Sequence, residues 1–166
     1  MRVPIRKGSP YARIKPDPNL TWEKFEQLKN QLEKLTKVSR PREAEEVKRL
    51  ALMGDFSENA GYQLAKGRLR GINQRIIDLE NIIKQAEIIS FGNNNGQVDL
   101  GSLVTVEMNQ QTKSYRILGS AETNPSAGII SHNSPLGAAL MHRRVGDVIS
   151  VNTNGIKKEY QIISIS

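Results

Sequence analysis

The first half of the chain has the apolar spacing of a helix that packs along one face. From residue 20 onward, apolar positions recur three and four residues apart, as in an amphipathic helix. The first of these are Phe25, Leu28, Leu32 and Leu35. Thr21 or Asn19 is expected to cap the helix start. Pro41 predicts a kink or a restart, with the proline in a first turn. The stripe then resumes at Ala44, Val47, Leu50 and Ala51.

A second helical arm follows with a more regular pattern. Its apolar positions step by four and three in the manner of a heptad seam. They are Ala65, Leu69, Ile72, Ile76, Leu79, Ile83 and Ala86. Two such arms of about 30 residues, at 1.5 Å rise per residue, predict an antiparallel coiled-coil hairpin about 45 Å long over residues 20–90. The periodicity alone equally suits a hairpin that serves dimerisation or acts as a spacer.

The second half changes to the shorter period of strands. A turn-rich linker is expected at residues 91–100, and an α+β domain at 101–166. Its four clearest strand segments are 103–106, 115–118, 148–151 and 160–163. One short helix is expected from Pro135 to His142, on one face of an antiparallel sheet.

The N-terminal residues 1–19 differ from both halves. They hold five Lys or Arg, one Asp and four Pro, a composition with too little apolar surface to offset the entropy of ordering. A flexible basic tail is therefore expected. It is either a solvated linker or a weak attractant for nucleic acid.

Composition narrows the range of partners and chemistries. The formal net charge of +7 favours partners with negative charge. The chain has no cysteine, which excludes disulfides, thiolate zinc sites and cysteine nucleophiles and suits a reducing compartment. No apolar stretch has the length of a signal peptide or membrane span. We therefore expect a cytoplasmic protein that does not associate with membranes.

Two carboxylates stand between the helical arms. Asp55 and Glu58 are three residues apart, a spacing that brings them near one face at a helix start and offers oxygen ligands to Mg²⁺. Two carboxylates are too few to hold Mg²⁺ alone, so a partner would have to supply further ligands. The same spacing is also a capping box, with Asp55 as N-cap. The two roles can coexist. Phe56 is expected to pack across the turn.

At this point the sequence resembles a known family. The segment GDFSENAGY, residues 54–62, is similar to the GDLSENAEY tip motif of the Gre family of bacterial transcription elongation factors. The similarity extends through LEKLTKVSRPREAEEV and KGRLRGINQRIIDLENIIKQAEII to the S-x-x-S-P-x-x-x-A-L stretch at residues 131–140. It covers about residues 20–166, leaving out only the tail.

The resemblance implies a fold and an activity. The hairpin would be a finger that enters the secondary channel of bacterial RNA polymerase, and residues 101–166 an FK506-binding-protein-like domain docked outside. Asp55 and Glu58 would help to position a second Mg²⁺ and its attacking water beside the polymerase's own metal, so that the polymerase cuts its backtracked RNA near the 3′ end. The Mg²⁺ would be shared with the polymerase and not held stably by the chain alone. The protein would be a monomeric accessory factor and not an enzyme.

Two further groups of residues acquire roles from the resemblance. The loop Asn133, Ser134 and Pro135 matches the element that grips the polymerase's coiled coil at the channel rim. Its plainer interpretation is a strand-to-helix turn, with Ser134 as cap and Pro135 in the first turn. His132 and His142 have no metal-ligand spacing or carboxylate partner in sequence, and are interpreted as ordinary surface or half-buried histidines.

Basic residues on the second arm resemble the RNA-holding face of some Gre factors. They are Lys66, Arg68, Arg70 and Arg75. Phosphate contacts would need no base specificity, and the alternative is a solvated face that keeps the rod soluble. Gly61 departs from the family's usual Glu and removes one acidic group from the tip. Gly67 and Gly71 each cost up to about 1 kcal/mol relative to Ala in a helix.

Two other functions compete with cleavage stimulation. A Gre-like protein could occupy the same channel and inhibit the polymerase without promoting cleavage, although the retained Asp55 and Glu58 argue against this. The expected fold of residues 101–166 also suggests a peptidyl-prolyl isomerase. Because fold does not imply function, and only Tyr115 and Tyr160 supply aromatic rings there, that possibility is weak.

Overall fold

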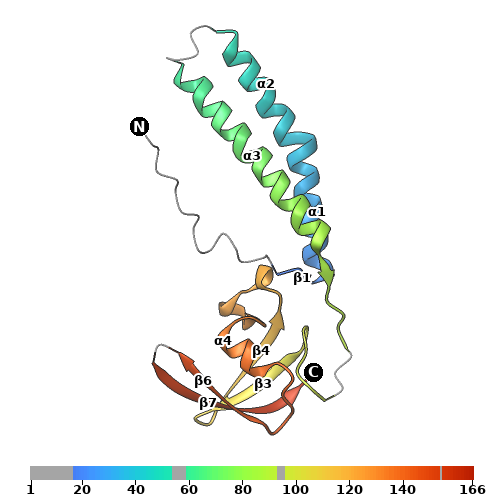
Figure 1. The fold of residues 1–166 in the computed structure, drawn as a ribbon, viewed down its shortest axis with the longest axis vertical. Coiled ribbons are helices and arrows are strands. Elements are labelled where there is room, and N and C mark those ends of the chain that lie inside the picture. Colours follow the sequence, from blue (N-terminus) through green and yellow to red (C-terminus); the bar gives the residue numbers. More distant parts are fainter. Residues whose placement is uncertain (1–16, 54–58, 93–95, 154) are drawn as a thin grey trace, which may run out of the picture.

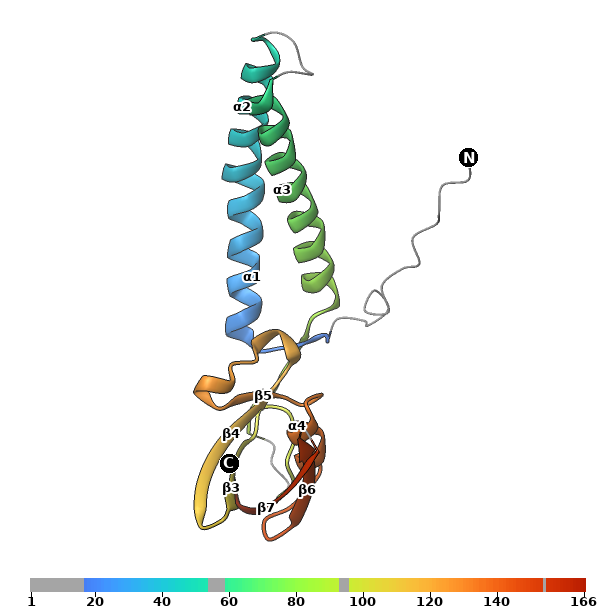
Figure 2. The same cartoon turned by 90° about the vertical axis from the view of Figure 1, so that its left-hand side faces the viewer.

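The computed structural model describes residues 17–53, 59–92, 96–153 and 155–166. These residues form a long helical hairpin, called the finger below, above a smaller sheet domain at its foot (Figure 1). The first arm consists of α1 (Trp22–Lys34), the π-helical turn η2 (Leu35–Ser39) and α2 (Arg40–Ala51), and the second arm is α3 (Ala60–Gln85). Both views show the arms side by side (Figures 1 and 2). None of the described helices is long and apolar enough to cross a membrane.

Pro41 does not interrupt the first arm. The backbone remains right-handed helical at Lys34, Ser39 and Arg40, and the Arg40 N–H bonds to the carbonyl of Leu35, five residues back. Proline has no N–H and its ring crowds the preceding turn of an α-helix. The wider π turn accommodates both effects. As expected, a new α-helix begins here with Pro41 in its first turn, but it continues from the π turn without a break in the helical backbone.

The apolar stripe continues past the π turn at all but one of its expected positions. Leu28 and Leu79 are buried in the lower half of the finger together with Leu20. Ala44, which was expected in the stripe, is exposed, whereas Glu43 is half-buried and faces Arg68 of α3. Val47, Leu50 and Ala51 remain half-buried as expected, so only Ala44 leaves the stripe in the upper half of the first arm.

A two-stranded parallel sheet closes the base of the finger. β1 (Asn19–Leu20) precedes α1, β2 (Glu87–Ile88) follows α3, and Leu20 lies opposite Ile88. The N-terminal tail was expected to extend to residue 19, but Asn19 is in this sheet and Asp17 bonds to the sheet domain. Residues 17–19 are thus part of the fold.

The sheet domain contains five strands in the order β5-β4-β3-β7-β6. The strands are β3 (Leu103–Met108), β4 (Gln111–Leu118), β5 (Ile129–Ser131), β6 (Val148–Thr153) and β7 (Ile156–Ile165). β4 and β5 are parallel and the other pairs antiparallel. The sheet is therefore mixed, not wholly antiparallel as expected. Two short 3₁₀ helices, η3 (Ser120–Glu122) and η4 (Pro125–Ala127), make the connection that returns β5 parallel to β4.

The core of this domain begins before the expected boundary. α4 (Pro135–Leu140) supplies Leu140 to a cluster with Val104, Ile117 and Ile162. Val98 is completely buried in the same cluster, and Gln97 bridges to Arg144. The stretch 91–100, expected as a linker, therefore contributes its last residues to the domain, because Val98 fills space that the strands leave.

Candidate functional site

The structure describes the two helix ends that flank the tip, and Asp55, Phe56 and Glu58 lie outside the described residues. α3 begins after Asn59, whose Oδ1 accepts from the Tyr62 N–H at 3.0 Å. Asn59 Nδ2 donates to the Leu50 carbonyl at 3.3 Å, which ties α3 to the end of α2. The N-cap of α3 is therefore Asn59, and the capping box led by Asp55 is wrong for this helix.

Gly61 lies on the inner side of the first turn of α3. A Cβ added there would stand 3.3 Å from Asn59 Oδ1 and 3.7 Å from Leu50 Cδ2. The Glu usual in the family would thus begin close to the cap oxygen. After the end of α2, Leu52 and Met53 are 81% and 65% exposed, so the described end of the first arm carries exposed apolar side chains.

The four basic residues of α3 do not form a single face. Lys66 and Arg70 are four residues apart and share one side of the helix, whereas Arg68 and Arg75, seven apart, share another. The Lys66 ammonium lies 5.8 Å from the Tyr62 ring centroid. Arg68 instead pairs with Glu43 of α2. The structure places Lys66 and Arg70 together, and assigns Arg68 to the contact between the arms.

The loop 133–135 is held by hydrogen bonds at the start of α4. Ser134 Oγ accepts from the Gly137 N–H at 3.0 Å and donates to the Ser131 carbonyl at 2.6 Å. The Asn133 N–H donates to Ser131 Oγ at 3.0 Å, while the Asn133 and Pro135 side chains are exposed. The expected cap at Ser134, with Pro135 in the first turn, is confirmed. The docking role of Asn133, Ser134 and Pro135 stays a prediction.

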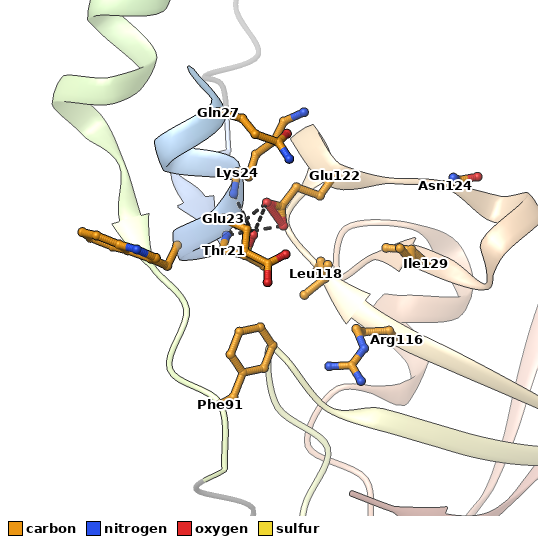
Figure 3. A pocket seen from close by; sticks show the side chains of 11 residues that line it. Thr21, Glu23, Lys24, Gln27, Phe91, Arg116, Leu118, Glu122, Asn124 and Ile129 are labelled. Atoms are coloured by element: carbon orange, nitrogen blue, oxygen red, sulfur yellow. Dashed lines mark hydrogen bonds between the residues drawn. The ribbon is translucent and has the colours of Figure 1, made fainter. Parts of the chain in front are cut away.

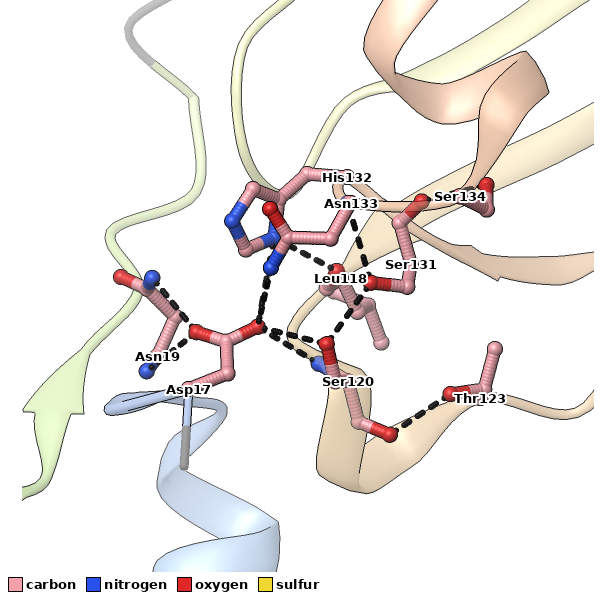
Figure 4. A network of polar contacts seen from close by, with 9 residues as sticks. All are labelled: Asp17, Asn19, Leu118, Ser120, Thr123, Ser131, His132, Asn133 and Ser134. Atoms are coloured by element: carbon pink, nitrogen blue, oxygen red, sulfur yellow. Dashed lines mark hydrogen bonds and ion pairs between the residues drawn. The ribbon is translucent and has the colours of Figure 1, made fainter. Parts of the chain in front are cut away.

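Asp17 connects this loop to the base of the finger (Figure 4). Its carboxylate accepts from the Ser120 N–H at 2.8 Å, the Asn19 Nδ2 at 2.8 Å and the Asn133 Nδ2 at 3.4 Å. Burial raises the pKa of Asp17, but the hydrogen bonds from Ser120 and Asn19 outweigh it and leave the pKa below its ordinary value. This carboxylate therefore stays charged within a polar network.

His132 belongs to the same network. Its Nδ1 lies 3.4 Å from Asp17 Oδ2, and its side chain is 20% exposed. The interpretation as a half-buried histidine is confirmed, but a carboxylate partner comes from the distant Asp17. His142 is largely exposed, with its Nδ1 3.4 Å from Asp99 Oδ1. Among residues 17–53, 59–92, 96–153 and 155–166, no group of three His, Asp or Glu is arranged to hold a metal ion.

A groove of about 850 Å³ separates the first turns of α1 from the sheet domain (Figure 3). Trp22 and Phe91 line it and are both more than half exposed. Leu118 and Ile129 form part of its sheet-domain wall, and the Arg116 guanidinium stands 5.9 Å from the Phe91 ring centroid. The groove therefore lies between the first turns of α1, the segment that contains Phe91 and the sheet domain.

Comparison with known proteins identifies both parts of the chain. Residues 19–88 match the family described as transcription elongation factor, N-terminal, and residues 93–166 match transcription elongation factor, GreA/GreB, C-term. Transcription elongation factor GreA of Macrococcus caseolyticus is 37% identical over 151 residues, covering 89% of this chain and 95% of its own. The chain belongs to the GreA/GreB family of transcription elongation factors.

A second GreA protein and one solved structure are also similar to this Gre factor. GreA of Staphylococcus saprophyticus is 38% identical over 149 residues, which cover 88% of this chain and 94% of that protein. The crystal structure of GreA factor homolog 1 of Thermus thermophilus is 32% identical, covers 89% of this chain and 97% of its own, and has a TM-score of 0.40. Gre factors are accessory to RNA polymerase, so this chain is not an enzyme and RNA polymerase is its partner.

Sequence reasoning missed the residues that join the finger of this Gre factor to its sheet domain. Asp17 was assigned to the tail, and Glu122, which accepts from Thr21, was given no role. Their partners lie 103 and 101 residues away, so no local spacing reveals them. The signal available was the run Asp17-Pro18-Asn19, in which an Asp and an Asn flank a proline directly before a helix cap.

Proposed function

We propose that this Gre factor inserts its finger into the secondary channel of bacterial RNA polymerase and stimulates the polymerase's cleavage of backtracked RNA. The observation that carries the proposal is the position of Asp55 and Glu58. They lie between Met53, where the described part of the first arm ends, and Asn59, which caps the second. Both carboxylates therefore belong to the segment that connects the two arms, and a helical arm of about 30 residues is about 45 Å long.

The donor set fits a shared magnesium ion better than a resident one. Carboxylate oxygens are the ligands that Mg²⁺ prefers, and Asp55 and Glu58 together supply fewer than its six positions. When bound between factor and polymerase, the ion would lower the pKa of a bound water and stabilise the charge that develops on phosphate oxygens. Asp55 and Glu58 would hold and orient it, and the polymerase would supply the other ligands and perform the hydrolysis.

The remaining proposed contacts divide between the two parts of the chain. Asn133 and Pro135 present exposed side chains from a rigid loop, which suits docking to the coiled coil at the channel rim. Lys66 and Arg70 offer positive charge on one face of α3, which suits contact with the phosphates of extruded RNA. We retain Arg68 and Arg75 as RNA-contact candidates on the other side of the helix.

A cleavage assay on backtracked elongation complexes tests the proposal. Purified factor is added with Mg²⁺, release of the 3′ RNA fragment is followed in time, and polymerase binding is measured in parallel. The test variant is Asp55→Asn with Glu58→Gln. The control is Glu23→Gln with Glu45→Gln, which removes the same charge from exposed positions of the first arm.

The outcomes separate the candidate functions. Acceleration by wild type and control, with normal binding but no acceleration by the test variant, supports the proposal. Binding without acceleration by every form would replace it with a regulator that occupies the channel. In that case Gly61→Glu, which restores the family's usual acidic group, is the next variant to examine.

A further inference from the structure

One 3₁₀ turn of the sheet domain holds the base of the finger at two points. η3 consists of Ser120, Ala121 and Glu122. Its first residue bonds to Asp17, which precedes β1, and its last residue bonds to Thr21, which caps α1. The two held positions lie on either side of β1, so η3 contacts the chain immediately before and after the strand that closes the finger.

The Asp17 carboxylate is almost completely buried and is surrounded by hydrogen-bond donors. Only 6% of its side chain is exposed. Its Oδ2 accepts from the Ser120 N–H at 2.8 Å and the Ser120 hydroxyl at 3.0 Å, and its Oδ1 accepts from the Asn19 N–H at 3.1 Å. A buried charge is costly without such donors. Because Oδ2 also faces Asn133 Nδ2 at 3.4 Å, a single side chain links the docking loop to the finger base.

The Glu122 contact is made with Thr21, the N-cap residue of α1. Its carboxylate accepts from the Thr21 hydroxyl at 2.6 Å and from the Thr21 N–H at 3.1 Å. The same Thr21 hydroxyl oxygen accepts from the Lys24 N–H at 3.2 Å and so caps α1. The start of the helix and its attachment to the sheet domain therefore depend on one side chain.

The backbone packs so closely beside η3 that there is no room for a side chain at Gly119. A Cβ added to Gly119 would stand 1.9 Å from the carbonyl oxygen of Asn19 in β1. The residue before η3 is thus in direct contact with the finger base, and any side chain larger than hydrogen must displace one of the two segments.

A small rotation at this attachment would produce a much larger displacement at the far end of the finger. A lever about 45 Å long moves its end by about 4 Å for each 5° of rotation at the base. Misplacing a catalytic group by about 1 Å can cost a hundredfold in rate. Glu122 of η3 is one of the residues that line the groove between the first turns of α1 and the sheet domain (Figure 3).

We propose that η3 sets the orientation of the finger relative to the polymerase-docking domain. Asp17 and Glu122 are the positioning residues that fix the angle at which α1 leaves this domain. This role rests on the cleavage function proposed above for its effect on RNA, but the geometry it predicts is measurable in the free protein. Neither residue touches RNA or the metal. Both act by setting where Asp55 and Glu58 arrive when Asn133 and Pro135 are docked.

Two variants disturb the attachment by different means. Asp17→Asn with Glu122→Gln replaces a carboxylate oxygen in each contact by a donor that faces other donors. Gly119→Ala leaves both carboxylates in place and drives β1 from η3. The single change Glu122→Gln is a milder form for use if either of these fails to fold. Glu45→Gln with Glu80→Gln, at two exposed positions that do not line the groove, is the charge-matched control.

The absence of cysteine in the sequence makes the angle directly measurable. Lys48→Cys on α2 and Ser150→Cys on β6, both at exposed positions, carry spin labels in each background. Pulsed electron paramagnetic resonance then gives the distribution of distances between finger and sheet domain. Helix content from circular dichroism confirms that the finger itself is intact.

The proposal expects a shifted or broadened distance distribution in both disturbed variants and not in the control. With backtracked complexes at saturating factor, it expects cleavage to fall by about tenfold or more while polymerase affinity stays within about twofold. An unchanged distribution overturns it, as does a changed distribution with wild-type cleavage. If wild type itself gives no cleavage, the function proposed earlier fails, and the distance distributions alone decide whether η3 sets the angle.

Discussion

Glu43 on α2 and Arg68 on α3 form an ion pair that joins the two arms of the finger. The Glu43 side chain is 18% exposed and the Arg68 side chain 55% exposed. Arg68 is therefore engaged within the hairpin, whereas Lys66 and Arg70 share another side of α3. Arg68 therefore has a structural contact within the hairpin in addition to the RNA contact proposed for it.

Charge reversal at these positions is expected to have two distinct effects. Lys66→Glu with Arg70→Glu should reduce cleavage of long backtracked RNA more than polymerase binding, because phosphate contacts are lost while docking remains. Arg68→Gln should mainly lower the free energy of unfolding, by about 0.5 kcal/mol, since its pair is partly exposed. Cleavage time courses and urea unfolding measure the two effects. Equal loss of binding and cleavage in the Lys66 and Arg70 variant would contradict the RNA assignment.

The Asn59 cap is expected to control the order of the first turn of α3. Asn59→Ala removes the acceptor for the Tyr62 N–H and the donor to the Leu50 carbonyl, and should destabilise the hairpin end by about 1 kcal/mol. Asn59→Asp keeps the cap oxygen and loses only the bond to Leu50. Hydrogen exchange at the Tyr62 amide measures the local effect. Exchange in the Ala variant as slow as in wild type would show that Asn59 is not the cap.

The glycines in the middle of α3 are expected to weaken the finger. A Cβ at Gly67 or Gly71 would meet nothing within 4 Å, so alanine fits at both positions. Each substitution should raise the free energy of unfolding by up to about 1 kcal/mol. Gly137→Ala is the contrasting control, because its Cβ would stand 2.1 Å from the Ser131 carbonyl oxygen. Urea unfolding followed by far-ultraviolet circular dichroism compares the three, and unchanged stability at both positions 67 and 71 would contradict the prediction.

Asp17 is expected to make the free energy of unfolding depend on pH in the acid range. Its pKa is lowered in the folded protein, because the hydrogen bonds from Ser120 and Asn19 outweigh burial. A carboxyl with a lowered folded pKa contributes stability that is complete above its unfolded pKa of about 3.9 and disappears as pH falls through the folded value. The stability difference between wild type and Asp17→Asn should therefore be constant above about pH 5 and narrow below about pH 4. Urea unfolding across this range measures it, and a constant difference down to pH 2.5 would exclude this linkage.

The elements that the sequence predicted correctly depend on local pattern. The three-and-four spacing determined both arms of the finger, and Thr21 and Ser134 were predicted as caps because a hydroxyl before an apolar run is a local signal. Asn59 was not chosen because the Asp55 and Glu58 spacing also matches a capping box. β5 was not predicted because three residues carry too little alternation to stand out from a loop.

The sequence by itself thus determined the two-part organisation, the long hairpin and the position of Asp55 and Glu58 between its arms, since each of these follows from contacts between residues close in the chain. Only the tertiary structure decided the parallel β5, the pairing of Glu43 with Arg68, and the attachment of Asp17 and Thr21 to η3. These join residues whose partners are set by how whole elements pack, and a hydrogen bond across 103 residues leaves no periodic trace in the sequence.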